Sequence, residues 1–137
     1  MSCVLIGGGS RSGKSRFALE YARRYALPLA FIATAETRDD EMQERVAAHR
    51  ADRGADFTTF EEPYDPARVI AEANGRFGAI VVDCLTLWLS NLLLADVADI
   101  ARRTGELLRI GSECPSPVLL VTNEVGCGIV PENALAR

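Results

Sequence analysis

The sequence predicts an α/β fold in which a mostly parallel β-sheet carries helices on both of its faces. Short apolar runs alternate with helical stretches along the chain, a pattern typical of βαβ units. The apolar runs are continuous rather than alternating, as expected of parallel strands that are covered on both faces. The length of 137 residues fits a single domain, residues 1–137, and 48% hydrophobic residues are enough for one packed core. Ligands of such sheets bind beyond the carboxyl ends of the strands, so residues at those ends are the first candidates for function.

The first predicted strand, residues 4–6, runs into a glycine-rich stretch with the spacing G-x-x-x-x-G-K-S and then into a helix expected at 14–25. Backbone N–H groups of such a phosphate-binding loop (P-loop) can surround phosphate oxygens, and the positive end of the helix dipole attracts the same anion. Lys14 would neutralise the β- and γ-phosphates, and the Ser15 hydroxyl would bind Mg²⁺. Lys14 is also the only lysine in the chain, which favours a specific role for it. The pattern indicates a nucleotide phosphate site formed by Gly8, Gly9, Ser10, Arg11, Ser12, Gly13, Lys14 and Ser15.

The remaining elements follow from hydrophobic periodicity, capping residues and turn residues. Further strands are expected at 29–34, 79–84 and 118–122, with a short extended segment at 57–63. Helices are expected at 39–53, 66–73, 85–95 and 96–110. The first of these helices should stop at Gly54, and Trp88 in the third should lie in the core.

Composition and the four cysteines restrict the function. A net charge of −4 argues against general binding to nucleic acid or to anionic membranes. No segment is long and apolar enough to span a membrane, and the amino terminus enters a strand without a signal peptide, so a cytoplasmic protein is expected. No two cysteines form a C-x-x-C pair, which favours free thiols in a reducing compartment over disulfides or a zinc site. The cysteines are Cys3, Cys84, Cys114 and Cys127.

Polar residues follow the predicted strands at the edge where the phosphate loop is expected. Asp83 ends an apolar run, and a carboxylate there can hold Mg²⁺, directly or through water, opposite Ser15. Asp83 could also cap the following helix, and the two roles are compatible. Farther along, Asn123 and Glu124 could position the nucleotide, the metal or the acceptor, or could belong to a structural loop.

His49 is the only histidine, and it shares one face of its predicted helix with Arg45 and Arg53. A solvated basic stripe and a nucleotide-facing surface both explain this spacing. In the second case the arginines would bind phosphate, and their charge would keep the imidazole neutral. A neutral imidazole can attack an α-phosphoryl group and form a covalent intermediate.

Glu61 and Glu62 lie in the extended segment before Pro63. Such carboxylates are solvated surface groups by default. A carboxylate could instead accept hydrogen bonds from the N1–H and N2–H₂ edge of guanine, and the residues alone leave both possibilities open.

Taken together, these segments resemble one enzyme family, the bifunctional adenosylcobinamide kinase / adenosylcobinamide-phosphate guanylyltransferase of cobalamin biosynthesis. The phosphate loop is shared with many unrelated enzymes, but the ordered set of segments is specific and covers essentially the whole chain. The set comprises residues 8–15, 32–36, 39–42 with Arg45 and His49, 61–63, 83–86, 88–92, 121–126 and 128–133.

The resemblance implies a P-loop, recombinase-like α/β fold and two reactions. The enzyme would phosphorylate the aminopropanol hydroxyl of adenosylcobinamide with ATP or GTP. It would then transfer GMP from GTP to that phosphate through a GMP-histidine intermediate at His49, giving adenosylcobinamide-GDP and pyrophosphate. The resemblance also implies a homotrimer with nucleotide sites near the subunit boundaries. The further nucleotide contacts that it implies are Thr34, Ala35, Glu36, Arg50, Ala51, Asp52, Arg53, Glu61 and Asp83.

Chains of this family usually run further, through another helix and closing strands, so the chain ending at Arg137 is expected to lack the C-terminal part of the domain. Two other functions remain open on the residues alone. The first is a small-molecule P-loop kinase without the transferase step, in which His49 is incidental. The second is a non-catalytic nucleotide-binding module.

Overall fold

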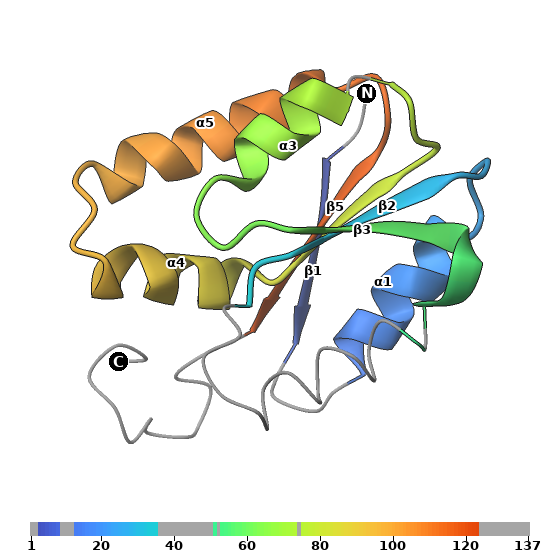
Figure 1. Ribbon diagram of the computed structural model, residues 1–137, viewed down its shortest axis with the longest axis horizontal. Coiled ribbons are helices and arrows are strands. Elements are labelled where there is room, and N and C mark those ends of the chain that lie inside the picture. The colour runs from blue at the N-terminus through green and yellow to red at the C-terminus, as the bar shows by residue number, and fades with distance from the viewer. Residues whose placement is uncertain (1–2, 9–12, 36–50, 52, 74, 124–137) are drawn as a thin grey trace.

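The computed structural model describes residues 3–8, 13–35, 51, 53–73 and 75–123. Within this part the strands form one parallel sheet with the order β1-β5-β4-β2-β3 (Figure 1). The strands are β1 (Cys3–Gly8), β2 (Leu29–Ala33), β3 (Phe57–Glu61), β4 (Ile80–Asp83) and β5 (Val118–Asn123). The predicted parallel α/β fold is confirmed. Because β5 inserts between β1 and β4, the strand before the phosphate loop lies two positions from the strand that ends in Asp83.

Helices cover both faces of the sheet (Figure 1). Helix α1 (Lys14–Ala22) packs on one face, where Ala18 and Ala22 join a buried cluster with Phe31, Val81 and Val121. The other face carries α3 (Pro66–Ala73), α4 (Leu85–Leu94) and α5 (Ile100–Glu113). Their buried side chains join a second cluster with alternate strand residues, and its members include Ile70, Leu92, Leu107, Ile32, Val82 and Leu120. Each fully buried aliphatic side chain of this kind contributes about 1.5–3 kcal/mol to folding.

Two predicted helix boundaries are wrong. Helix α1 ends at Ala22, before the predicted end at residue 25. The helix expected from residue 96 begins only at Ile100 and then runs to Glu113. Asp96 and Asp99 have φ angles of 54° and 59°, in the left-handed region that a right-handed α-helix excludes. Aspartate tolerates this region better than most residues. The two residues therefore interrupt the helix and separate α4 from α5.

Most of the predicted helix at 39–53 lies outside the described residues, which do not include 36–50 or 52. Its end is described. Ala51 and Arg53 are helical, and the 3₁₀ turn η1 (Gly54–Asp56) follows, with Gly54 at φ 65°. The prediction that the helix stops at Gly54 is confirmed.

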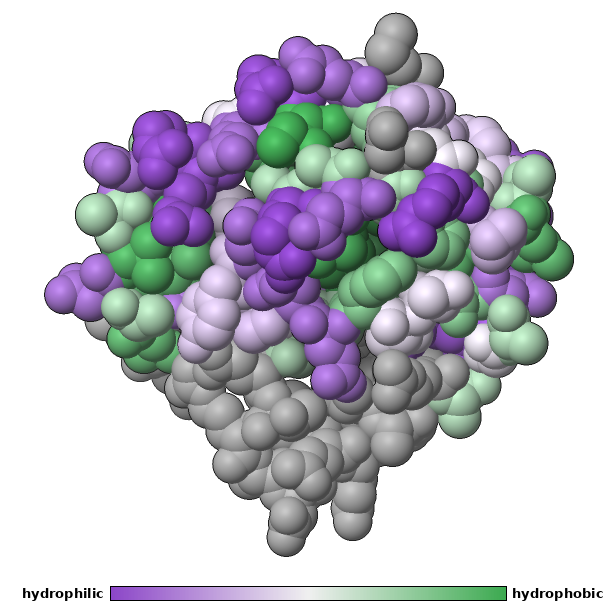
Figure 2. All heavy atoms as spheres, turned by 45° about the horizontal axis from the view of Figure 1, so that its top comes forward, coloured by the Kyte–Doolittle hydropathy of each residue, from purple (hydrophilic) through white to green (hydrophobic). Residues whose placement is uncertain are grey.

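Seen from the side of α3 and α5, hydrophilic side chains cover most of the surface, and apolar residues appear in separate small areas (Figure 2). Helix α5 contributes ion pairs one turn apart, from Arg102 to Glu106 and from Arg109 to Glu113. Exposed pairs of this kind add little to stability, but they keep the outer side of the helix in water. None of the described helices is long and apolar enough to cross a membrane.

Candidate functional site

The carboxyl ends of the five strands meet along one edge of the sheet, here called the carboxyl edge. Gly8 is paired with Asn123 in the register of β1 and β5. Ala33 is paired with Glu61 on one side and with Asp83 on the other. The prediction that these strand ends lie together is confirmed, and the edge brings together residues from segments that are distant in the sequence.

The described part of the phosphate loop has the backbone that its sequence predicts. Gly8 ends β1, and Gly13 precedes α1 with φ 82°, in the left-handed region that favours glycine. Lys14 and Ser15 form the first turn of α1, and Gly13 gives that turn no side-chain cap. Amide N–H groups of an uncapped first turn can bind an anion. Gly9, Ser10, Arg11 and Ser12 lie outside the described residues.

Ser15 and Asp83 are in direct contact. The Ser15 hydroxyl donates a hydrogen bond of 2.8 Å to Oδ2 of Asp83, and this bond joins α1 to the end of β4. Hydroxyl and carboxylate oxygens are the donors that Mg²⁺ prefers, and Mg²⁺ commonly takes only one or two protein ligands beside substrate phosphates. Among the described residues no group of three or more His, Cys, Asp or Glu side chains could hold a metal ion. The pair therefore fits Mg²⁺ bound together with a nucleotide.

Cys84, rather than Asp83, caps helix α4. Its Sγ accepts a hydrogen bond of 3.4 Å from the Leu87 amide, so capping by Asp83 is wrong and the Asp83 carboxylate faces Ser15 instead. Burial raises the pKa of the Cys84 thiol above its usual value of 9.0, and the Leu87 amide and Lys14 lower it only in part. The thiol is therefore protonated at neutral pH and serves as a neutral cap. Cys3 and Cys114 are also free, as predicted for the cysteines.

Thr34 fixes the turn that follows Asp83. Its side chain is fully buried, and its Oγ1 donates to the Cys84 carbonyl at 2.8 Å and accepts from the Cys84 amide at 2.9 Å. The Thr34 amide also donates to the Asp83 carbonyl at 3.1 Å. The hydroxyl of this predicted nucleotide contact is thus used within the protein. Ala35 follows it half-buried, and Glu36 lies outside the described residues.

Arg53 packs against the middle of strands β2 and β3, at one side of the sheet. Only 4% of the residue is exposed, its guanidinium lies 3.8 Å from the ring centre of Phe31, and Nη2 donates to Thr59 Oγ1 at 3.1 Å. These partners lie in β2 and β3, two positions before the strand ends, on the face that α1 covers. A nucleotide contact by Arg53 stays a prediction. Ala51 is exposed, and His49, Arg50 and Asp52 lie outside the described residues.

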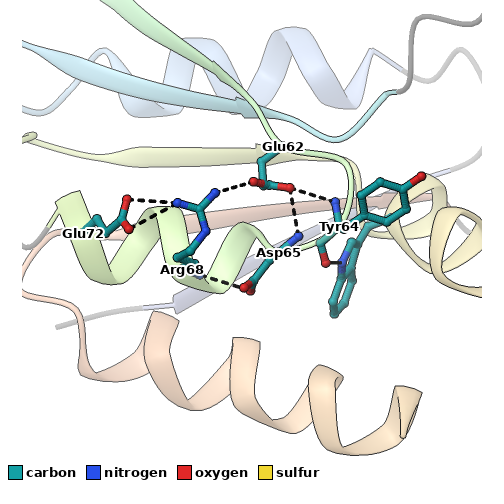
Figure 3. A network of polar contacts seen from close by, with 6 residues as sticks. Glu62, Tyr64, Asp65, Arg68 and Glu72 are labelled. Carbon is teal, nitrogen blue, oxygen red and sulfur yellow. Dashed lines mark hydrogen bonds and ion pairs between the residues drawn. The ribbon is translucent and has the colours of Figure 1, made fainter. Parts of the chain in front are cut away.

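Glu61 and Glu62 have different environments, which the sequence left open. Glu61 ends β3 with its side chain exposed beside β2. The Glu62 carboxylate instead accepts from the amides of Tyr64 and Asp65, at 3.1 and 3.2 Å, and pairs with Arg68 (Figure 3). Glu62 therefore orders its own loop, and Glu61 is the carboxylate that remains at the carboxyl edge.

Helix α4 supplies two residues of the site whose roles sequence reasoning missed. Asn91, only 3% exposed, donates through Nδ2 to the carbonyls of Thr34 and Pro63, at 2.6 and 3.0 Å. Thr86 accepts a hydrogen bond of 3.0 Å from the Asn123 amide at the end of β5. The signal for Asn91 was present, because it is the only amide side chain in the mostly apolar helix LTLWLSNLLL. Trp88 is buried, as predicted.

Asn123 brings a polar side chain to the carboxyl edge between β1 and β4. Its Oδ1 is buried and has no hydrogen-bond donor among the described residues. A buried amide oxygen of this kind can accept a hydrogen bond from a ligand. Glu124 lies outside the described residues.

The parallel sheet, the loop sequence between β1 and α1, and the Ser15–Asp83 pair define a P-loop nucleotide-binding protein. A solved structure titled as a prototypical ATPase from the type III secretion system of pathogenic bacteria has a similar fold, with a TM-score of 0.56 over 98% of this chain and 46% of that chain. At 12% identity this likeness concerns the fold alone.

The chain belongs to the cobinamide kinase / cobinamide phosphate guanyltransferase family, which it matches over residues 4–137. It is 46% identical over 136 residues to the bifunctional adenosylcobalamin biosynthesis protein CobP of Pseudomonas aeruginosa, covering 97% of this chain and 78% of that protein. It is 38% identical over 148 residues to the bifunctional protein CobU of Salmonella typhimurium and 34% identical to that of Escherichia coli, covering 81% of each.

Proposed function

We propose that this protein catalyses two successive transfers, first phosphorylating adenosylcobinamide and then attaching GMP to the product. Membership of the family supports both reactions. The observation that carries the proposal is the contact between Ser15 and Asp83, because it closes a phosphate and metal site at the carboxyl edge. A fold with a P-loop sequence but no acid opposite its serine would support nucleotide binding less well.

In the first reaction the aminopropanol hydroxyl oxygen attacks the γ-phosphorus of ATP or GTP. The bond from that phosphorus to the β,γ-bridging oxygen breaks, the nucleoside diphosphate leaves, and the hydroxyl proton passes to solvent or base. Lys14 and the amides of the α1 amino terminus would hold the transferred charge in place. The buried Oδ1 of Asn123 lies at the same edge and could accept a hydrogen bond from the attacking hydroxyl.

In the second reaction an imidazole nitrogen of His49 attacks the α-phosphorus of GTP. A P–N bond forms, the bond to the α,β-bridging oxygen breaks, and pyrophosphate leaves. A phosphate oxygen of adenosylcobinamide phosphate then attacks the same phosphorus, the P–N bond breaks, and adenosylcobinamide-GDP is released with a free histidine. We place Glu61 at the guanine N1–H and N2–H₂ edge, because it is the exposed carboxylate at the end of β3.

We also propose that Ser15 and Asp83 bind Mg²⁺, which would neutralise phosphate charge when bound. Nucleotide contacts by 8–15, by Thr34 to Glu36 and by Arg50 to Arg53 remain part of the proposal, supported by the resemblance of these segments to the family. The resemblance further supports a homotrimer, and the free thiols Cys3, Cys84 and Cys114 support a reducing compartment such as the cytoplasm. Sedimentation velocity of the purified chain tests the trimer.

The decisive experiment incubates the chain with Mg²⁺ and GTP labelled with ³²P at the α-position, denatures it, and measures label on the protein. The expected label is acid-labile and base-stable, as for a phosphoramidate, and it should disappear in His49→Ala. Arg109→Ala is the control, because it removes one cation from an exposed ion pair on α5 and should retain the label.

Three results would contradict parts of this proposal. No adduct in a chain that binds GTP would exclude the covalent mechanism. Transfer of the γ-phosphate to adenosylcobinamide without an adduct would indicate a plain kinase. Binding of Mg-GTP without any turnover in the presence of adenosylcobinamide would indicate a nucleotide-binding module.

A further inference from the structure

We infer that Asn91 is a positioning residue for guanine selection. From helix α4 it holds the two chain segments that leave β2 and β3, and it thereby fixes Glu61 at the carboxyl edge. This inference rests on the proposed function, because it takes Glu61 as the contact to the guanine edge. Asn91 itself is buried and touches backbone rather than ligand.

The two hydrogen bonds of Asn91 require a side chain that carries two donor hydrogens on one atom. Nδ2 donates to the Thr34 carbonyl at 2.6 Å and to the Pro63 carbonyl at 3.0 Å. The two acceptors lie 57 and 28 residues away in the sequence, so a single amide joins two separate segments. A hydroxyl offers one donor and an aliphatic side chain none, so neither can replace the amide.

A second side chain of α4 supports the same segment. Trp88, one helical turn before Asn91, donates from Nε1 to the Tyr64 carbonyl at 2.8 Å. Figure 3 shows that the other side of this segment is held by the Glu62 carboxylate, which bonds the amides of Tyr64 and Asp65 and pairs with Arg68. The chain that follows Glu61 is therefore fixed from the helix side and from within.

Glu61 is fixed from the strand side as well. It is paired with Ala33 in the register of β2 and β3, and the following amide, that of Glu62, donates to the Ala33 carbonyl at 2.9 Å. The bond from Asn91 to Thr34 acts on the residue directly after Ala33. Removing the Asn91 donors would thus loosen the segment that follows Glu61 and the segment that follows its strand partner Ala33, without changing the Glu61 side chain.

Helix α4 also connects this end of the site to the phosphate end. It begins at Leu85, two residues after Asp83, and Asn91 lies about 9 Å along its axis at 1.5 Å per residue. Asn91 reaches the Ser15–Asp83 pair only through Thr34, and that pair is also held by α1 and β4, so a loss of the Asn91 hydrogen bonds should act more strongly on the guanine end.

The test compares GTP with ITP, which lacks the N2 amino group of guanine, in equilibrium binding to the full chain. A hydrogen bond from that amino group to a carboxylate corresponds to a preference for GTP of about tenfold or more. We expect this preference in the wild type and its loss in Glu61→Gln. Asn91→Leu, which keeps the volume but removes both donors, is expected to lower the preference at least about threefold.

The matched control is Leu107→Ala, which removes buried volume from α5 but no side-chain hydrogen bond. It destabilises the fold and should leave the GTP-to-ITP ratio unchanged, whereas a purely structural role for Asn91 would make the two variants behave alike. A folded Asn91→Leu with the wild-type ratio would overturn the inference.

If Asn91→Leu does not fold, Asn91→Ser takes its place, because its hydroxyl can make at most one of the two hydrogen bonds. An unchanged ratio in Asn91→Ser would then overturn the inference. If the wild type binds GTP and ITP equally well, both the inference about Asn91 and the proposed contact between Glu61 and guanine are wrong. A missing adduct at His49, with the GTP preference intact, would contradict only the proposed transferase mechanism.

Discussion

Replacing Thr34 by valine removes one hydroxyl from the turn that places Asp83, and we expect it to weaken both the fold and the metal-dependent site. The hydroxyl donates to the Cys84 carbonyl and accepts from the Cys84 amide, at 2.8 and 2.9 Å. Valine keeps the shape of threonine, so the packing around this fully buried position is preserved. The Cys84 amide would nevertheless lose its partner, and the Cys84 carbonyl would keep only the hydrogen bond from the Trp88 amide.

The magnitude follows from these two groups. The Cys84 amide left without a partner costs about 1–3 kcal/mol and the hydrogen bond lost by the carbonyl adds about 0.5–1.5 kcal/mol, which gives about 1.5–4.5 kcal/mol for the two. The lower half of this range applies, because Cys84 is only partly buried and the additional methyl group recovers about 0.8 kcal/mol. We expect the free energy of unfolding to fall by about 2–3 kcal/mol. Thr34→Ser keeps both hydrogen bonds, loses one methyl group and should cost about 1 kcal/mol.

Urea unfolding followed by the fluorescence of Trp88, the only tryptophan, measures these differences directly. Nucleotide binding with Mg²⁺ and with EDTA shows whether the turn has moved. Thr34→Val should lose the enhancement by Mg²⁺, and Thr34→Ser should keep it. The reasoning is refuted if the valine variant is as stable as the wild type, or if serine and valine cost the same.

Three further predictions concern other parts of the site. Arg53→Met should lower the free energy of unfolding by about 2–3 kcal/mol, since it removes the contacts with Phe31 and Thr59; a folded variant that instead loses only GTP affinity would show a ligand contact. Asp83→Asn should reduce Mg²⁺-dependent nucleotide binding at least about tenfold without affecting binding in EDTA, and an equal loss in both conditions would contradict metal binding there. Because the folded state raises the pKa of the Cys84 thiol, its contribution to stability is complete below the unfolded pKa and is lost as the pH rises through the folded pKa. The free energy of unfolding should therefore fall above about pH 9 in the wild type and fall less in Cys84→Ser, as measured by urea unfolding at several pH values.

The sequence predicted the elements that have strong local signals. Continuous apolar runs located the strands, and the spacing of glycines before Lys14 located the loop and the start of α1. The contact between Ser15 and Asp83 was also predictable, because a parallel sheet brings strand ends to one edge. The strand order was not, since the position of β5 between β1 and β4 is fixed only by packing of distant segments.

The errors arose where a side chain had several possible partners. Aspartate can sit in a helix or in a left-handed turn, and residues 96–99 adopt the second conformation at Asp96 and Asp99. A cysteine rarely caps a helix, so the sequence offered Asp83 as a possible cap, whereas the structure shows Cys84 in that role. Arg53 and Asn91 could be placed on their helices, but their partners lie on strands and loops that no local pattern identifies.

The buried polar residues around the carboxyl edge act on the backbone that carries the site. Thr34 holds the turn after Asp83, Asn91 holds the segments beside Glu61, and Thr86 holds the end of β5 at Asn123. Each uses a hydroxyl or amide that bonds main-chain groups, and Thr86 also contacts the Thr122 hydroxyl, so the strand ends are ordered before a ligand binds, which reduces the cost of binding. The two ends of the site should consequently respond to different substitutions. Loss of the Thr34 hydroxyl should change the dependence on Mg²⁺, and loss of the Asn91 amide should change the choice of base. A variant at either position that altered both properties equally would show that the carboxyl edge moves as one unit.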